Sequence, residues 1–532
     1  MKTLKKLFAL VATVATCLSL GATSVLAEGD STTTTTGSIT INNATGTYAI
    51  YQLFKGDVVE TTANNETTKT ISNAQWGDSW NEAAKKAAAE EGVDAAKAVE
   101  IVASYTTEDE ILDFAKIILA KNEQGQYVDM TGSNATATAT KAEGATSATA
   151  TFSNLPYGYY LIENTEVASG ESYTKYIFAV VGETAVVINN KTDVPSMTKK
   201  VKDTNDSTGV TSDWQDSADY DIGDAVPFQL TGTVASNYAD YKTYYFAFHD
   251  VEEKGLTFDA SSVKVKVDGT EITSGYTVNT SATDECTFEV VFSNLKDIES
   301  VHAGSVITVD YNSTLNESAN IGSQGNVNKA KLEFSNNPNE EQSGETKPGT
   351  GETPWDNVIV FTYQTVVNKV DQAGAALAGA EFTLEKYDAA TQTWVASKTA
   401  TLNEAGTSFT FKGLDDGQYR LTESKTPAGY NTCAPIEFTV TAEHTIEWDG
   451  TDRTGTETKP AVLTSLKATG LSTDEISGDL TDGSITTNVV NKKGSVLPST
   501  GGIGTTIFYV TGAILMLGAG VLLLSRRNST SK

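Results

Sequence analysis

The chain has 532 residues, with 38 Lys and Arg against 68 Asp and Glu, so its formal net charge is −30. This acidic balance argues against nucleic acid as a partner and suits a soluble extracellular surface, while the length predicts about three domains. Its 43 glycines, with abundant Thr and Tyr and few helical patterns, predict a mostly β fold. With only three histidines, we predict no metal site, no cofactor and no enzymatic turnover.

The first 27 residues have the pattern of a secretory signal peptide. Lysines open the chain, an apolar stretch follows, and Val25-Leu26-Ala27 ends it, so cleavage is predicted after Ala27. The cysteines that remain, Cys286 and Cys433, fall in different predicted units, which argues against a disulfide framework. An exported chain of this kind needs another cross-link if it bears load.

The mature chain reads as three β units in a row. The first spans residues 28–192 and alternates as strands do, except for an Ala-, Glu- and Lys-rich helical insertion within residues 76–120. A second unit follows over residues 193–338, a polar linker over 339–354, and a third unit over 355–494. We therefore predict an all-β chain of three tandem Ig-like sandwiches, which describes a stalk rather than a compact enzyme.

Strand alternation in the third unit points three polar groups toward the core. Lys369 ends an apolar face of the first strand, Glu423 shares a face with Tyr419, and Asn491 ends the inward face of the last strand. A half-buried ion pair beside an amide, or side chains extending out at strand ends, would explain each residue alone. Together, burial would neutralise the amine and the acid, so that Lys369 could attack the Asn491 amide polarised by Glu423 and release ammonia.

These residues lie in a segment that resembles a known family. Gly413-Leu-Asp-Asp-Gly417, Tyr419-Arg-Leu-Thr-Glu423 and Pro427-Ala-Gly-Tyr430 resemble the glutamate-bearing box of Cna-B-type domains in Gram-positive pilins and adhesins. The resemblance implies a spontaneous isopeptide bond between Lys369 and Asn491, with Glu423 as the catalytic acid.

The second unit repeats this logic with an aspartate. Strand alternation points Lys199, Asp250 and Asn328 inward, and the segment resembles the middle domain of sortase-assembled shaft pilins. That resemblance implies a bond between Lys199 and Asn328, catalysed by Asp250. Asn336 and Asn337 are nearby alternatives at the strand exit.

Two other features of the second unit are predicted to be ordinary surface. His249 lies on the opposite strand face from Asp250, and we expect it at the surface. Asp219, Asp221 and Asp224 lack the ligand spacing of a known calcium loop, so a solvated strand entry is expected there.

The first unit carries the acidic box but no matching amine. Glu163 follows Tyr159 and Leu161 on one face, and Asn189 or Asn190 ends the last strand, yet Asn43 occupies the place of the lysine. We therefore predict that this unit has no internal bond and is the most labile.

Residues 495–532 form a three-part C-terminal signal. Leu497-Pro498-Ser499-Thr500-Gly501 precedes an uncharged run over residues 503–524, which at 1.5 Å per residue covers roughly 33 Å, and arginines follow. A plain stop-transfer anchor has the last two parts. The whole resembles a sortase cell-wall sorting signal, which implies cleavage between Thr500 and Gly501 and transfer of the threonyl carboxyl to an amine.

The resemblance to shaft pilins also implies which amine receives Thr500. Lys191 follows the last strand of the first unit, although Asn-Asn precedes it where the family has Tyr-Pro; Lys175 and Lys200 are rivals. The implied protein is the major subunit of a head-to-tail covalent pilus on a Gram-positive surface. Its partners would be other copies of itself, pilus-class and housekeeping sortases, ancillary pilins, peptidoglycan and host or cell-surface ligands. The alternative is a singly anchored adhesin or an ancillary tip or base pilin.

Overall fold

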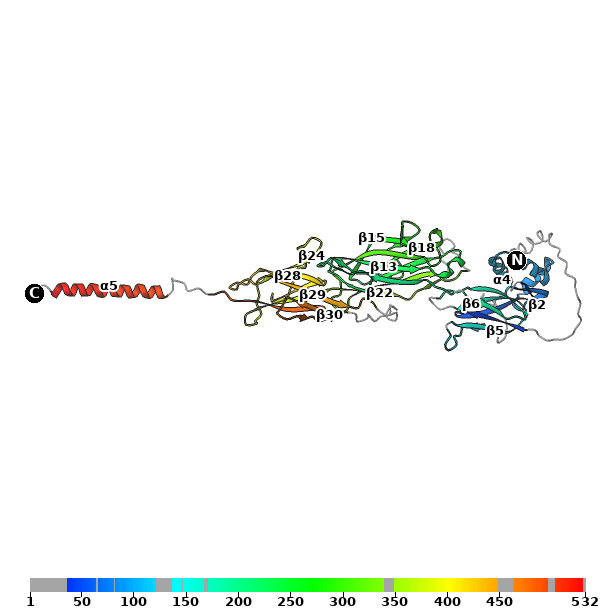
Figure 1. Cartoon of the computed structure of the whole chain (residues 1–532), viewed down its shortest axis with the longest axis horizontal. Helices are drawn as coiled ribbons and strands as arrows, with labels where there is room; N and C mark the ends of the chain where they lie inside the picture. Colours follow the sequence, from blue (N-terminus) through cyan, green and yellow to red (C-terminus); the bar gives the residue numbers. More distant parts are fainter. Residues whose placement is uncertain are drawn as a thin grey trace.

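A computed structural model describes residues 36–63, 66–80, 82–120, 136–145, 147–166, 171–190, 192–338, 349–447, 463–495 and 503–529. Three β-rich units lie one after another along the long axis of the molecule, with helix α5 apart from them at the C-terminal end (Figure 1). The mostly β fold predicted from the sequence is confirmed.

The first unit packs two sheets and three helices together. One sheet has the order β5-β1-β8 and the other β3-β2-β6-β7, with β4 also paired to β2. The strands are β1 (Thr36–Asn42), β2 (Thr47–Ala63), β3 (Glu66–Trp76), β4 (Thr136–Thr138), β5 (Thr149–Pro156), β6 (Gly158–Glu166), β7 (Tyr176–Val181) and β8 (Val186–Asn189). The predicted helical insertion is confirmed as α2 (Glu82–Glu90), α3 (Ala95–Ala103) and α4 (Glu108–Ile118). Thr107 and Glu110 form a capping box that starts α4, and buried Phe114 joins α4 to the core beneath it.

The second unit is a sandwich of a five-stranded sheet, β16-β15-β19-β13-β9, and a larger sheet, β12-β22-β20-β14-β18-β17, with β21 also paired to β20. Their alternation of buried and exposed residues is regular, as in β19, because each strand has one face on the core. The elements are β9 (Ser196–Val201), β10 (Thr204–Asn205), β11 (Val210–Thr211), β12 (Ser217–Asp219), β13 (Ala225–Thr233), η1 (Ser236–Asp240), β14 (Phe246–Glu252), β15 (Leu256–Val267), β16 (Thr270–Ile272), β17 (Thr277–Asn279), β18 (Phe288–Phe292), η2 (Leu295–Asp297), β19 (Val306–Leu315), β20 (Asn326–Ser335), β21 (Thr350–Glu352) and β22 (Asp356–Phe361).

The sheet of the second unit extends beyond the predicted boundary at residue 338. Strand β21 pairs with β20, and β22 pairs with β20 and β12, so residues assigned to the linker and the third unit complete this sheet. The pairing covers an edge of β20 that would otherwise present free backbone groups. Val358 and Val360 of β22 pack into the core of the second unit, whereas Ile359 and Phe361 pack into that of the third. Strand β22 therefore belongs to both units.

The third unit is a sandwich of the sheets β26-β27-β23-β32 and β25-β24-β28-β29-β30-β31. Its strands are β23 (Tyr363–Asp371), β24 (Glu381–Asp388), β25 (Thr393–Ala396), β26 (Thr401–Leu402), β27 (Ser408–Leu414), β28 (Gly417–Lys425), β29 (Ile436–His444), β30 (Leu463–Thr469), β31 (Ile476–Ser477) and β32 (Ser484–Asn491). The first strand, β23, and the last strand, β32, are parallel neighbours, and β1 and β8 of the first unit pair in the same way. In the second unit, the first strand β9 and the late strand β20 lie in opposite sheets.

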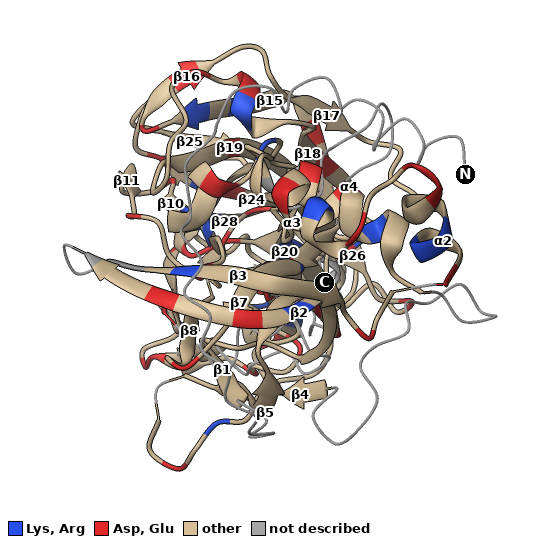
Figure 2. Cartoon of the chain, turned by 90° about the vertical axis from the view of Figure 1, so that its right-hand side faces the viewer, with Lys and Arg blue, Asp and Glu red and all other residues tan. Residues whose placement is uncertain are grey.

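Helix α5 (Ile503–Ser529) contains a stretch, Ile507–Arg526, that is long and apolar enough to cross a membrane, with a mean hydropathy of 2.3. None of the most apolar window is buried in the protein. Figure 2 looks onto the opposite end of the molecule, where basic and acidic residues are interspersed rather than gathered into one basic surface. Helix α5 therefore fits the predicted anchor.

Candidate isopeptide centres and the assembly signal

The second unit brings Lys199, Asp250 and Asn328 together around the hydroxyl of Tyr311. The Lys199 Nζ donates to Asp250 Oδ2 at 2.5 Å and to the Tyr311 hydroxyl at 2.6 Å. The hydroxyl in turn donates to Asp250 Oδ2 at 2.7 Å, and Asn328 Nδ2 donates to the hydroxyl at 2.9 Å. Lys199, Asp250 and Asn328 are fully buried, so water does not compete for these contacts.

The electrostatics of this centre favour neutral reactants. Burial lowers the pKa of Lys199, even though the Asp250 carboxylate acts in the opposite direction. Burial also raises the pKa of Asp250, against the opposing effect of Lys199. Because each shift disfavours the charged form, a proton passes from the ammonium to the carboxylate more readily than in water. The amine is then a nucleophile and the acid a hydrogen-bond donor.

A second acid, Glu252, lies directly opposite Asn328 in the pairing of β14 with β20. Its Oε1 accepts from Asn328 Nδ2 at 3.3 Å, and burial, followed by the charge of Asp250, raises its pKa to about 8. Asn328 Oδ1 and Asp250 Oδ1 are buried without a hydrogen-bond partner among the described residues. Each of these oxygens lacks a donor, and a protonated carboxyl is a group that supplies one.

The third unit brings Lys369, Glu423 and Asn491 together in another buried cluster. Asn491 Nδ2 donates to Glu423 Oε1 at 2.7 Å, and the backbone N–H of Cys433 donates to Glu423 Oε2 at 2.9 Å. Lys369 Nζ donates to the Val489 carbonyl at 2.9 Å, two residues before Asn491 on the neighbouring parallel strand. Burial lowers the pKa of Lys369, with Glu423 acting in the opposite direction.

In the first unit, amides occupy the corresponding place. Asn42 and Asn189 are neighbours on the parallel strands β1 and β8, where Asn42 Nδ2 donates to Asn189 Oδ1 at 2.9 Å. Asn43 Nδ2 donates to the Asn190 carbonyl at 3.4 Å, and Glu163 accepts from the Tyr51 hydroxyl at 3.1 Å. None of these described contacts contains an amine. The absence of an internal bond in this unit stays a prediction.

Tyr311 and Glu252 were missed by reasoning from the sequence. Glu252 shares its strand face with Asp250, two residues away, so alternation could have found it. Tyr311 is on a strand of the facing sheet, and its partners could not be chosen without the register between the sheets. Asn336, one of the alternatives to Asn328, instead donates through Nδ2 to the Glu171 carbonyl at the contact with the first unit.

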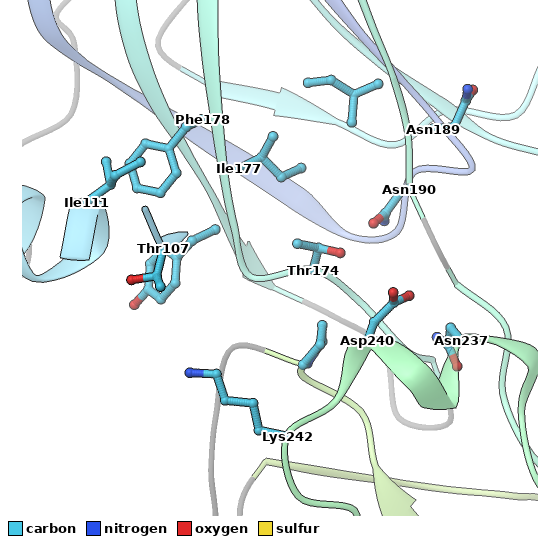
Figure 3. A pocket seen from close by; sticks show the side chains of 13 residues that line it. Thr107, Ile111, Thr174, Ile177, Phe178, Asn189, Asn190, Asn237, Asp240 and Lys242 are labelled. Carbon is cyan, nitrogen blue, oxygen red and sulfur yellow. The ribbon is translucent and has the colours of Figure 1, made fainter. Parts of the chain in front are cut away.

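The residues predicted to act in assembly lie outside the described residues, as does the signal peptide. They are Lys191, Leu497, Pro498, Ser499, Thr500 and Gly501. The neighbours of Lys191 are described. Asn190 and Thr192 line an opening of about 690 Å³ between the first and second units. Asn190 also borders an adjacent pocket of about 650 Å³ (Figure 3), which is lined by β7, β8 and the start of α4 from the first unit and by Asn237, Asp240 and Lys242 from the second.

The acidic segment at residues 219–224 is not the solvated strand entry that we expected. Asp219 and Asp221 are buried where the second unit meets the third. Lys386 Nζ contacts Asp206 at 3.0 Å, Asp221 at 2.7 Å and Asp415 at 2.9 Å, so one lysine of the third unit ties aspartates of both units. The reason is the tight approach of the units, which removes these side chains from water and requires a compensating cation.

His249 is likewise not at the surface. It does face away from Asp250, but it is only 5% exposed, since residues 284–289, Glu333 and Trp355 surround it. Asp284 and Glu289 lie at its Nδ1, and Glu333 lies at its Nε2. Its pKa is raised: burial alone would lower it, but the hydrogen bond with Glu333 and the other carboxylates outweigh that effect.

Comparison with known proteins matches three parts of the chain to family models. Residues 222–338 match the Cna-B-like domain of Gram-positive pilin backbone subunit 2, residues 364–454 match the SpaA prealbumin-like fold domain, and residues 489–530 match the LPXTG cell wall anchor motif. With the sandwich fold and the apolar α5, these matches define the class. The chain thus combines a Gram-positive pilin backbone domain, a prealbumin-like domain and an LPXTG cell-wall anchor, the parts of a cell-wall-anchored backbone pilin that is held in the membrane before sortase cleavage.

Known proteins are similar to the chain over most of its length. Over 422 residues the chain is 27% identical to the trypsin-resistant surface T6 protein of Streptococcus pyogenes serotype M6, covering 68% of this chain and 72% of that protein. The solved T6 backbone pilin of serotype M6, with its modular three-domain structure, superposes with a TM-score of 0.52 at 20% identity, over 88% of this chain and 100% of that one. The full-length major pilin SpaD of Corynebacterium diphtheriae gives a TM-score of 0.47 at 19% identity, over 86% and 98%.

Proposed function

We propose that this pilin is the shaft subunit of a head-to-tail fibre, in which Thr500 of one copy is joined to Lys191 of the next. The Thr500–Gly501 peptide bond breaks, an amide forms between the Thr500 carbonyl carbon and Lys191 Nζ, and the fragment that begins at Gly501 leaves. The openings beside Asn190 and Thr192 support this assignment, because they provide space for an incoming peptide next to the two described residues that flank Lys191 in the sequence. A heterologous contact of this kind does not close on itself, so it makes an open fibre.

The proposal includes the enzymes and partners that such a fibre requires. A pilus-class sortase would join the subunits, and a housekeeping sortase would transfer the last Thr500 to peptidoglycan. Ancillary pilins would occupy the tip or base, and a host or cell-surface ligand would be bound by the finished fibre. The chain itself performs no turnover, since its only chemistry is a single internal reaction in each of two units.

For the internal reaction, we propose amide exchange between Lys199 and Asn328. Neutral Lys199 Nζ attacks Asn328 Cγ while protonated Asp250 donates to the amide oxygen. The new Nζ–Cγ bond forms, the Cγ–Nδ2 bond breaks, and ammonia leaves with the proton that the amine gives up. The observation that carries this proposal is the Tyr311 hydroxyl, which contacts the amine, the acid and the amide at once. Prior positioning of this kind replaces an external catalyst.

The same reaction is proposed for Lys369 and Asn491, with Glu423 as the acid. The Asn491–Glu423 hydrogen bond of 2.7 Å supports the role of the acid. The Cys433 backbone N–H helps to hold Glu423 in place. The parallel pairing of β23 with β32 brings Lys369 beside the end of the last strand. Each proposed bond thus ties the first strand of a unit to a late strand of the same unit.

The fibre proposal is tested by SDS-resistant multimers in cell-wall extracts. We expect a ladder in the parent strain that Lys191→Ala abolishes. Lys175→Ala and Lys200→Ala are matched controls, because each removes a rival amine near the same junction, and both should leave the ladder intact. A ladder that persists in Lys191→Ala would remove Lys191 from the mechanism.

The alternative function, a singly anchored adhesin or an ancillary tip or base pilin, needs the sorting signal but no acceptor lysine. A singly anchored adhesin predicts a wall-attached monomer and no ladder in the parent strain. The internal bonds are compatible with both functions, so their detection would not separate the two.

A further inference from the structure

The outer face of β14 carries a second cluster, on the side opposite to the proposed isopeptide centre. His249 projects from β14, its cross-strand neighbour Glu289 from β18, and Asp284 and Cys286 from the loop that leads into β18. These side chains border a pocket of about 310 Å³. They come from adjacent strands and a short connection, so the sheet itself fixes their spacing.

Nitrogen, oxygen and sulfur donors converge on one point in this cluster. His249 Nδ1 lies 2.9 Å from Asp284 Oδ2 and 3.6 Å from Cys286 Sγ, and that sulfur lies 3.3 Å from Asp284 Oδ2. Glu289 Oε1 approaches the same nitrogen at 3.2 Å. The backbone N–H of Cys286 donates to Asp284 Oδ1 at 3.3 Å, which holds the loop carboxylate in this orientation.

These separations are close to the edges of a zinc coordination tetrahedron. With Zn–N and Zn–O near 2.0–2.1 Å and Zn–S near 2.3 Å, tetrahedral angles place N and O about 3.3 Å apart, and sulfur about 3.5 Å from either. The distances in the cluster differ from these values by 0.4 Å or less. Small side-chain rotations would therefore complete the geometry.

A second carboxylate supports the ring of His249 from behind. Glu333 Oε2 lies 3.2 Å from His249 Nε2, and Glu333 Oε1 accepts from the Thr350 hydroxyl at 2.6 Å. A proton held on Nε2 by Glu333 leaves the lone pair on Nδ1, which faces the other donors. Metal-binding histidines have this kind of carboxylate partner, and it fixes both the tautomer and the ring orientation.

We propose that His249, Asp284 and Cys286 bind one zinc ion or a similar divalent transition metal, with Glu289 or water as the fourth ligand. Imidazole and thiolate favour zinc over calcium or magnesium, which select oxygen donors. Metal binding displaces the thiol proton of Cys286. The site joins β14 to β18 and its preceding loop, outside the proposed covalent cross-links, and its presence does not depend on polymerisation.

The test is a titration of the purified, chelator-treated protein with zinc chloride, followed by calorimetry, and with cobalt chloride, followed by absorption. We expect one zinc per chain and a cobalt–thiolate charge-transfer band. Cys286→Ala should remove that band, and Asp284→Asn should weaken zinc binding at least tenfold. Glu333→Gln should weaken it by about 10- to 100-fold without removing the band, because Glu333 acts through His249.

Two matched variants control for adventitious binding. Cys433→Ala removes the other cysteine that the structure describes, and His302→Ala removes an exposed histidine of the same unit. Both should bind zinc like the parent. Absence of stoichiometric zinc in the parent, or unchanged affinity in Cys286→Ala, would overturn the proposal. Because Cys286 is only half-buried, this variant should fold, and its melting temperature without metal checks that it does.

Discussion

Replacing Glu423 with Gln should prevent the Lys369–Asn491 bond with little change in shape. Gln has nearly the same shape and one acceptor oxygen, so it can accept from the Cys433 backbone N–H or from Asn491 Nδ2 but not from both, and it cannot act as the acid. The parent protein should have an intact mass lower than its sequence mass by two molecules of ammonia. Glu423→Gln should lack only one, because the Lys199–Asn328 bond still forms in the second unit.

The expected loss of stability follows from the loop that the bond closes. Lys369 and Asn491 are separated by nearly the whole third unit, and closing a loop of a little over 100 residues removes about 5 kcal/mol of chain entropy from the unfolded state. For a domain of this size, that should lower the melting temperature of the third unit by on the order of 15–25 °C. The first unit shares no strand with the third and should melt as in the parent, which gives each scan an internal reference.

The control is Glu163→Gln in the first unit, which repeats the acidic box without an amine. It should change neither the number of ammonia molecules lost nor the melting of the third unit. The reasoning is refuted if Glu423→Gln still lacks two molecules of ammonia, or if the parent lacks none. A lost bond with an unchanged melting temperature would refute the entropy argument alone.

Three further predictions concern the second unit and its junction with the third. Tyr311→Phe removes the hydroxyl that contacts both Lys199 and Asp250. In a time course of intact mass, newly made protein should therefore release the ammonia of the Lys199–Asn328 reaction more slowly than the parent. Release at the parental rate would contradict this role of Tyr311. Burial raises the pKa of Asp203 to about 6 and of Asp416 to about 7, so the folded junction holds protons that the unfolded chain releases. The contribution of these groups to the free energy of unfolding should therefore rise as the pH falls from 8 to 5. We expect this as slower amide hydrogen exchange at the junction, after correction for intrinsic exchange rates. Faster corrected exchange at lower pH would contradict the prediction. Lys386→Met leaves Asp221 and Asp415 buried without their cation, which should cost about 3–5 kcal/mol by calorimetry, whereas Lys425→Met, at an exposed pair, should cost at most about 1 kcal/mol.

Strand alternation was sufficient to find residues whose side chains point into a core. Lys199, Asp250, Lys369 and Asn491 were predicted to face inward, and all are almost completely buried. That prediction needs only the period of two along a strand, which is local. It does not show which inward side chains meet across the sandwich, and so Tyr311 could not be paired with the reactants.

The boundary of the second unit and its junction with the third were harder to predict because they depend on how units pack. Strand β22 has the sequence Asp-Asn-Val-Ile-Val-Phe, whose unbroken apolar run hides that alternate residues face two different cores. Lys386 and Asp221 look like solvated strand ends when each unit is considered alone. Only the close approach of the units, where the glycines Gly322 and Gly483 leave no room for a Cβ atom, makes them a buried ion cluster.

The placement of the proposed bonds determines which parts of the chain would carry tension in a fibre. Force would enter at Lys191, pass to Lys199, cross to Asn328, continue to Lys369, cross to Asn491 and leave at Thr500. The first unit precedes the entry point and would carry none of this force, which is consistent with its lack of an amine. Between the two cross-links, only the segment from Asn328 to Lys369 would depend on non-covalent structure. That segment contains β22, which is held between β20 and β12 by strand pairing, and it borders the junction where Lys386 ties the two units together. The buried ion cluster therefore lies where the proposed covalent path offers no protection, and we expect it to resist separation of the second and third units.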